Sequence, residues 1–129
     1  MKYYNSRTIS STTVAAIRPK VEAALKKEGF GVLTEIDLQA TMKKKLNKDY
    51  LPHLILGACS PVYADKVISI EPTISTMLPC NVTLRELENG AVEIAIIDPS
   101  AAMGAVENPD LEAPAAEVQE KLMRVLNSI

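Results

Sequence analysis

The stretch MLPCNVTLRELENGAVEIAIID, residues 77–98, decides the fold. Apolar and polar side chains alternate on both sides of the tripeptide ENG at 88–90, and such alternation is typical of strands with one buried face. The Asn89-Gly90 pair suits the positive φ angles of a tight hairpin turn. These residues therefore predict two neighbouring antiparallel strands, over 77–87 and 91–98.

Outward from this hairpin, strands and helices alternate along the chain. Further strands are expected over 2–9, 30–38 and 53–59, and helices over 12–28, 39–47, 61–70 and 110–127. In the strand over 30–38, simple alternation places Phe30, Val32, Thr34, Ile36 and Leu38 on one face. Residues 98–110 form the longest irregular stretch, and long loops are often functional.

This order predicts an α+β fold in one domain, residues 1–129: a two-layer sandwich whose antiparallel sheet carries helices on one face. Strand parity leaves Ile55, Ala95 and Ile97 on the other face, beside Glu93 and Thr83. A half-apolar sheet face favours burial in a homodimer. Scattered surface hydrophobes, which are normal in proteins, are the alternative.

Composition restricts the classes of partner. A net charge of −2 and a pI near 5.4 argue against nucleic-acid and membrane-surface binding, which need a basic field. The basic run at 42–46 is interpreted as a solvated helix face. The start of the chain shows no export signal, so a cytoplasmic location is expected. The two cysteines are then expected to be reduced.

The cysteines lie at the ends of two expected strands, Cys59 in LGACSP and Cys80 in LPCNV. If these strands are antiparallel neighbours, the two thiols are close. Strand parity places them on opposite faces, which disfavours a disulfide unless a bulge at Gly57 or Pro79 resets one strand. Both thiols are either small apolar fillers of the core or parts of a site.

Cys59 immediately precedes the expected helix that Ser60 caps and Pro61 begins. Unpaired N–H groups and the helix dipole there are expected to lower the pKa of Cys59. Apolar neighbours on the face of Cys80 would raise the pKa of that thiol instead. Cys59 is therefore predicted to be the more acidic and more reactive of the two.

The sequence predicts neither a metal site nor a cofactor. His53, the only histidine, lies six strand residues from Cys59, or about 20 Å, too far to share an ion. Met77 and Cys80 could hold Cu(I), but their spacing matches no known signature. Glu71 and Asp98 each precede a proline, where a helix stop or turn is favoured over acid–base chemistry. No catalytic constellation is recognised, so no enzyme activity is predicted.

The blocks GFGVLTEIDLQATMKKKL, LILGACSP, EPTISTMLPCNVTL and IDPSAAM resemble the prokaryotic domain-of-unknown-function family number 302, over roughly residues 9–126. The resemblance implies a TATA-binding-protein-like β-α-β4-α sandwich, a cytosolic homodimer and no established activity. Two positions depart from the expected pattern. Ser60 replaces an Asn after the first cysteine, which removes a side-chain amide, and Ser75 replaces a Gly.

Three function classes follow. The first is a homodimeric module that binds a small ligand near Cys59 and Cys80, with the 98–110 loop contributing to the pocket. The second is a thiol-based redox or soft-metal-handling protein, and the third is an interaction protein that uses its sheet face. The residues expected to bind a ligand are Cys59, Ser60, Glu71, Cys80, Asn81 and Asp98.

Overall fold

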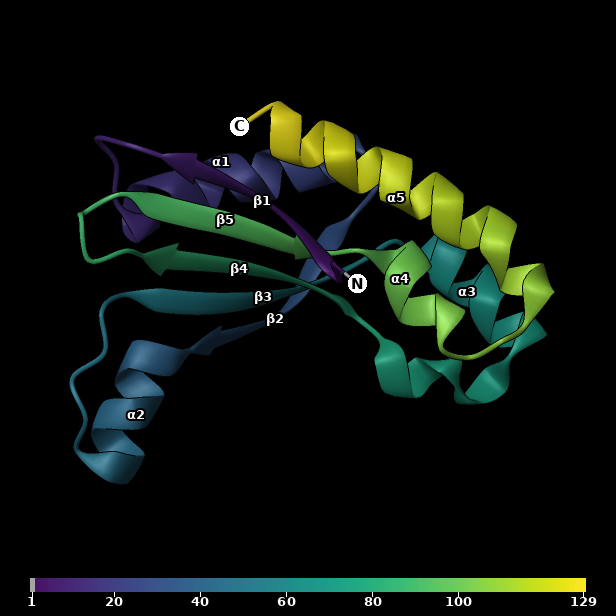
Figure 1. Cartoon of the computed structure of the whole chain (residues 1–129), viewed down its shortest axis with the longest axis horizontal. Helices are drawn as coiled ribbons and strands as arrows, with labels where there is room; N and C mark the ends of the chain where they lie inside the picture. Colours follow the sequence, from purple (N-terminus) through teal and green to yellow (C-terminus); the bar gives the residue numbers. More distant parts are fainter. Residues whose placement is uncertain (1) are drawn as a thin grey trace.

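The computed structural model describes residues 2–129, and an antiparallel sheet of five strands forms one of its layers (Figure 1). The strands are β1 (Tyr4–Ile9), β2 (Gly31–Asp37), β3 (His53–Cys59), β4 (Cys80–Glu86) and β5 (Val92–Ile97). They lie in the order β1-β5-β4-β3-β2, so β2 to β5 form a meander and the chain crosses the sheet once, between β1 and β2. The predicted α+β fold with an antiparallel sheet is confirmed.

The central hairpin forms as its sequence predicts. Strands β4 and β5 pair in continuous register from Val82 opposite Ile96 to Glu86 opposite Val92. Gly90 has a φ of +87°, a conformation that costs glycine little, and the Asn89 side chain accepts a hydrogen bond from the backbone of Ala91. The local turn chemistry therefore fixes this register.

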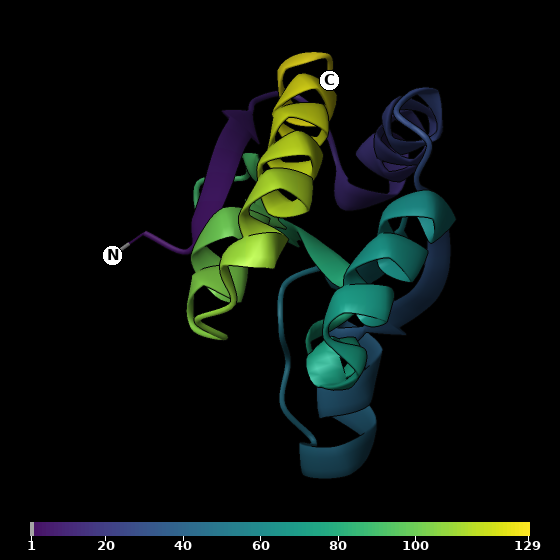
Figure 2. The same ribbon diagram turned by 90° about the vertical axis from the view of Figure 1, so that its right-hand side faces the viewer.

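Helices α1 (Val14–Lys27) and α5 (Glu112–Asn127) cover one face of the sheet (Figures 1 and 2). Both present an apolar stripe at helical spacing, and these stripes meet the inward side chains of the strands. The fully buried members of this core include Val21, Leu25, Leu56, Val82, Leu84, Val92, Ile94 and Val125. This face supplies the main core.

Local signals set the ends of α1. The Thr13 side chain accepts a hydrogen bond from the Ala16 N–H at 3.0 Å and caps the helix start. At its end, Gly29 has a φ of +84°, and the Phe30 N–H donates to the Leu25 carbonyl at 3.0 Å. This is the Schellman arrangement that favours glycine. Pro19 lies inside α1 without dividing it.

The prediction that alternate residues of 30–38 share one sheet face is wrong beyond Val32 of strand β2. Its register with β3 shifts between Val32 and Thr34, so that Val32 pairs with Ala58 but Thr34 pairs with Gly57. A bulge of this kind inserts one residue and reverses the facing of everything beyond it. Glu35 therefore shares the helix-covered face and bonds Arg18 of α1 at 2.5 Å, whereas Ile36 lies on the open face.

Helix α2 (Leu38–Leu46) stands beside β2, away from the layer of α1 and α5 (Figures 1 and 2). The remaining helical segments gather at one end of the sheet. They are α3 (Pro61–Ile70), α4 (Pro99–Gly104) and the short 3₁₀ segments η1 (Pro72–Met77) and η2 (Pro109–Leu111). A second buried cluster joins them to α5, through Val67, Ile74, Met103, Leu111 and Ala115. The stretch 98–110, expected to be irregular, thus contains a helix.

Candidate functional site

The two cysteines lie on neighbouring antiparallel strands at the end of the sheet that faces α3. Cys80 pairs with Ala58 across the β3–β4 ladder, and Cys59 follows Ala58 directly. A strand spacing of about 4.8 Å and a rise of about 3.3 Å place the two cysteine Cα atoms about 6 Å apart. Both thiols are free. The condition of the prediction, antiparallel neighbouring strands, is met, and the register keeps Cys59 on the face opposite Ala58 and Cys80, as strand parity predicts.

Glycine at position 57 permits this close approach of the two cysteine blocks. A Cβ atom there would lie 2.1 Å from Thr34 Oγ1 and 2.7 Å from Pro79 Cγ. Both distances are far below van der Waals contact, so only a residue without a side chain fits between β2 and the start of β4. The expected bulge at Gly57 or Pro79 lies instead in β2, opposite Gly57.

Cys59 and Cys80 line one small cavity, which we call the thiol cavity. Its volume is about 30 Å³, and its walls come from the sheet end, α3, α4 and α5. Apart from Ser60 and the Tyr63 hydroxyl, the surrounding side chains are apolar or sulfur-bearing. They are Phe30, Ala58, Tyr63, Ala64, Val67, Leu78, Pro79, Met103, Pro114, Ala115 and Val118.

Burial governs the acidity of both thiols. It raises the pKa of Cys80 to about 11, with a smaller contribution from the neighbouring Cys59. It also raises the pKa of Cys59, so the predicted lowering by the α3 helix dipole is wrong. Ser60 occupies the N-cap position and Pro61 begins the helix as predicted, but the Ser60 side chain makes no capping hydrogen bond.

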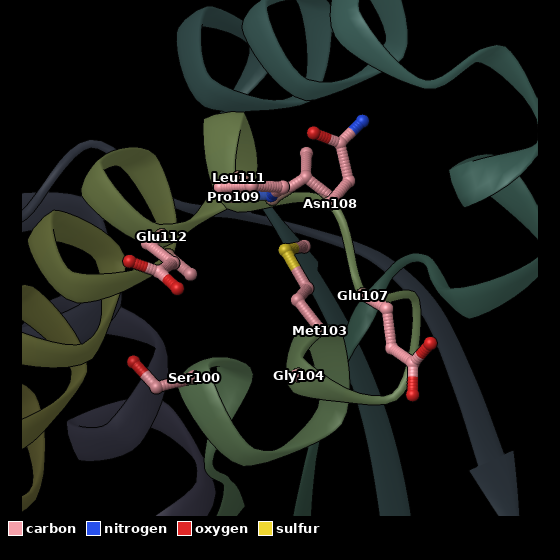
Figure 3. A pocket seen from close by; sticks show the side chains of 9 residues that line it. Ser100, Met103, Gly104, Glu107, Asn108, Pro109, Leu111 and Glu112 are labelled. Atoms are coloured by element: carbon pink, nitrogen blue, oxygen red, sulfur yellow. The ribbon is translucent and has the colours of Figure 1, made fainter.

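A larger cleft opens on the other side of Met103 (Figure 3). Its volume is about 270 Å³, and it lies between α4 and the start of α5. Met103 and Leu111 point toward its middle, while Ser100 and Glu112 face each other across one side (Figure 3). Further lining comes from Gly104, Glu107, Asn108, Pro109 and Ala115.

Met103 and Ala115 line both the cleft and the thiol cavity, so the two spaces share a wall. Met103 is a flexible side chain, and it packs in the second buried cluster rather than in the main core. Rotation of this side chain alone would change the separation between cleft and cavity. The cysteines and the 98–110 stretch therefore lie in one region of the molecule.

Glu71 and Asp98 position the segments around the cleft. The Asp98 side chain accepts a hydrogen bond from the Ala101 N–H at 3.1 Å and caps α4. The Glu71 carboxylate accepts one from the Asn108 side-chain amide at 3.3 Å, which ties the end of α3 to the loop before η2. Neither residue lines the cleft or the thiol cavity.

The structure separates Asn81 from the other expected site residues. It follows Cys80 on β4 and therefore points to the helix-free face, where it is exposed. There it lines a groove of about 390 Å³ together with His53, Thr83, the Arg85–Glu93 ion pair and Ile97. Burial, with help from Arg85, lowers the pKa of His53.

Metal ligation by the usual hard and borderline donors finds no support among residues 2–129. No three His, Cys, Asp or Glu side chains in this part of the chain converge on one point. His53 and Cys59 occupy opposite ends of β3, as their spacing predicts. Met77, the methionine considered beside Cys80, is exposed and does not line the thiol cavity, whereas Met103 does.

Sequence reasoning missed Met103, Glu112 and Ser100 as cleft residues. One signal was available: Asp98-Pro99 has the pattern of an N-cap followed by a helical first position, which predicts α4. A helix there would have placed Ser100 and Met103 three apart on one face. That α4 faces α5 depends on tertiary packing and has no local signal.

Among the helices of residues 2–129, none has the length and apolar composition needed to cross a bilayer. Together, the sheet topology and the thiol cavity define a class of small α+β proteins with two cysteine blocks at one end of an antiparallel sheet. The family model for the domain of unknown function DUF302 matches residues 6–129. The chain belongs to this family, and the resemblance found in its sequence is confirmed.

A crystal structure of an uncharacterized conserved DUF302 protein from Bacillus stearothermophilus is similar throughout. It is 26% identical, the alignment covers 98% of each chain, and the TM-score is 0.90. No curated protein matches the chain. The comparisons therefore establish the family and the fold and indicate no specific activity.

Proposed function

We propose that this protein is a homodimeric module that binds a small organic ligand in the cleft between α4 and α5. The observation that carries the proposal is the wall shared by the cleft and the thiol cavity at Met103 and Ala115. A cleft of about 270 Å³ lies just below the usual range for small-molecule sites, about 300–1,000 Å³. Movement of Met103 toward the thiol cavity would enlarge it.

The cleft combines an apolar floor with polar groups at its margin, as ligand sites usually do. Met103, Leu111 and Ala115 form the floor, whereas Ser100 and Glu112 provide a hydroxyl and a carboxylate. Among residues 2–129, no lysine or arginine lines the cleft. The fitting ligand is therefore small, with an apolar part and a group that donates hydrogen bonds or carries positive charge.

Gly104 offers a direct test of this proposal. It lines the cleft, and an added Cβ would meet nothing within 4 Å, so Gly104→Leu places a bulky side chain at the cleft wall with no clash at its Cβ. A fragment library screened by protein-observed NMR should give hits that shift Met103 and Ala115 signals. Gly104→Leu should abolish them. The neighbouring control Ala105→Leu, outside the cleft, should preserve them.

Hits that survive in Gly104→Leu, or that map elsewhere on the wild-type protein, would contradict a ligand site between α4 and α5. Both variants should first be shown to unfold at or above the wild-type temperature. That comparison separates a blocked cleft from a damaged fold.

The dimer is proposed to bury the helix-free face of the sheet. Ile55, Ala95 and Ile97 point to this face, and the β2 bulge adds Ile36, which is 46% exposed. Helix α2 contains no buried residue. A nine-residue helix is marginal in water without packing, and contacts with a second copy on the neighbouring sheet face would stabilise it.

Ile97→Glu tests this interface. A carboxylate on the buried face of a two-fold contact is desolvated twice, once in each protomer, and should yield monomers in sedimentation-velocity experiments. The control Val62→Glu changes a 70% exposed residue on α3 and should leave the dimer intact. An unchanged dimer in Ile97→Glu would remove this face as the interface.

A further inference from the structure

A hydroxyl and a carboxylate face each other across one side of the α4–α5 cleft (Figure 3). Ser100 stands in the first turn of α4, and Glu112 begins α5. The floor beside them is apolar, and Met103 and Leu111 point toward its middle. On the basis of the ligand site proposed above, we propose that the cleft takes primary alkylamines, with the ammonium group between Ser100 and Glu112 and the alkyl chain over Met103.

The pair of polar groups suits an ammonium head better than a neutral or anionic one. A serine hydroxyl and a carboxylate both accept hydrogen bonds, and an ammonium group has three donors and no acceptor. Glu112 forms no ion pair with another residue of 2–129, so its carboxylate has no cation of the described chain beside it. An alkylamine is charged at pH 7, as a lysine side chain is, and its hydrogen bonds to this pair are charge-assisted.

The other polar side chains of the cleft are engaged or directed elsewhere. The Asn108 amide nitrogen donates to Glu71 at 3.3 Å, and its oxygen accepts from the Asp110 N–H at 3.0 Å. The Glu107 carboxylate points away from Ser100 and Glu112 (Figure 3). The cleft therefore offers one place for a charged head group.

Met103 gives the alkyl chain its room. This side chain is unbranched and flexible, and the thiol cavity of about 30 Å³ lies directly behind it. When a chain enters the cleft, the Met103 methyl group moves into that cavity, and the chain takes its place against Leu111. Each methylene buried in this way should strengthen binding about fourfold.

NMR titration at pH 7 with n-butylamine, n-butanol and butyrate tests the head group, read from the Met103 methyl and Ala115 amide signals. Butylamine should bind about tenfold more tightly than butanol, and butyrate should not bind. Glu112→Gln should remove this preference. The matched control Glu107→Gln makes the same change of charge on the same cleft and should keep it, because the Glu107 carboxylate points away.

The alkyl chain has its own pair of variants on α3. Val67 lines the thiol cavity, whereas Val62 is 70% exposed and lines neither space. Val67→Ile adds a methyl group where Met103 must move and should weaken n-hexylamine binding about fourfold. Val62→Ile should leave it unchanged, and equal affinities of the two variants would refute the movement of Met103.

Butyrate that binds as tightly as butylamine, or a preference for amines that survives in Glu112→Gln, would overturn the proposed ligand class. A carboxylate at the start of α5 also favours the helix dipole, so the readout is the amine-to-alcohol ratio and not stability. Glu112→Asp should restore most of that ratio, and Ser100→Ala should lower it if Glu112→Gln fails to fold. Neutral or anionic fragments that shift the Met103 signal, where amines do not, would refute the ligand class and leave the α4–α5 site standing, so the two failures are distinguishable.

Discussion

Replacement of Gly57 by alanine should destabilise the protein through a clash that the backbone geometry makes unavoidable. The new Cβ would lie 2.1 Å from Thr34 Oγ1 and 2.7 Å from Pro79 Cγ. The Thr34 hydroxyl can rotate away, but rotation brings its methyl group toward the same space. Pro79 is a rigid ring on the neighbouring strand segment and has no alternative rotamer.

The magnitude follows from the measured cost of overpacking, about 1–3 kcal/mol for one added methyl-sized group. Two simultaneous contacts, one of them rigid, place Gly57→Ala near ~2 kcal/mol. For a chain of this size, ~2 kcal/mol lowers the melting temperature by roughly 8 °C. Urea unfolding should show a reduced midpoint with an unchanged slope.

Two comparisons isolate the clash. Gly31→Ala introduces the same change in the same sheet, where nothing lies within 4 Å of the new Cβ, and should alter stability by less than about 0.5 kcal/mol. Thr34→Ala removes the nearer obstacle and should recover part of the loss in the double variant. Equal stabilities of Gly57→Ala and Gly31→Ala would refute the close approach of the two cysteine blocks.

Three further outcomes are expected. Iodoacetamide should label both thiols slowly at pH 7 and faster as the pH rises, because their raised pKa values leave little thiolate at neutral pH. Peptide mass analysis should show that Cys59 reacts before Cys80, and faster labelling of Cys80 would contradict this order. A crystal structure of protein purified without reductant should show no bond between these two sulfurs; continuous density at about 2.05 Å would refute that expectation. Asp98→Ala should lower the free energy of unfolding by about 1 kcal/mol because it removes the α4 cap, and the urea midpoint should fall. Asp98→Asn preserves a capping oxygen and should lower the free energy of unfolding less; equal losses would argue against a capping role.

The sequence predicts most of the architecture because its signals are local. Asn89-Gly90, Gly29 and the Ser60-Pro61 pair each specify a turn or a helix end through backbone chemistry that acts within a few residues. The structure contains the hairpin and the helix boundaries at these positions.

Strand β2 shows where local reasoning ends. Alternation places Val32 and Ile36 on one face, but the register shift at residue 33 separates them. No residue in 31–37 requires a bulge by itself. The cause lies on the neighbouring strand, where Gly57 has no side chain and Thr34 packs over it. A bulge set by a partner strand cannot be derived from the bulged strand alone.

The candidate site was predicted in part for the same reason. Strand order brings the end of β3 beside the start of β4, whereas parity places the two cysteines on opposite faces, and both follow from local elements. The position of Met103 depends on how α4 packs against α5, which is a long-range property of the second buried cluster. The helix start after Cys59 is a local feature, but desolvation, which depends on the whole surroundings, raises the pKa of that thiol.

Burial keeps the Cys80 thiol protonated at neutral pH. A thiol with a pKa near 11 is ionised to only about one part in ten thousand at pH 7, and the thiolate is the nucleophile. The one histidine, His53, lies at the other end of β3 from Cys59. The burial that raises the pKa of Cys80 therefore makes this thiol a poor nucleophile at neutral pH.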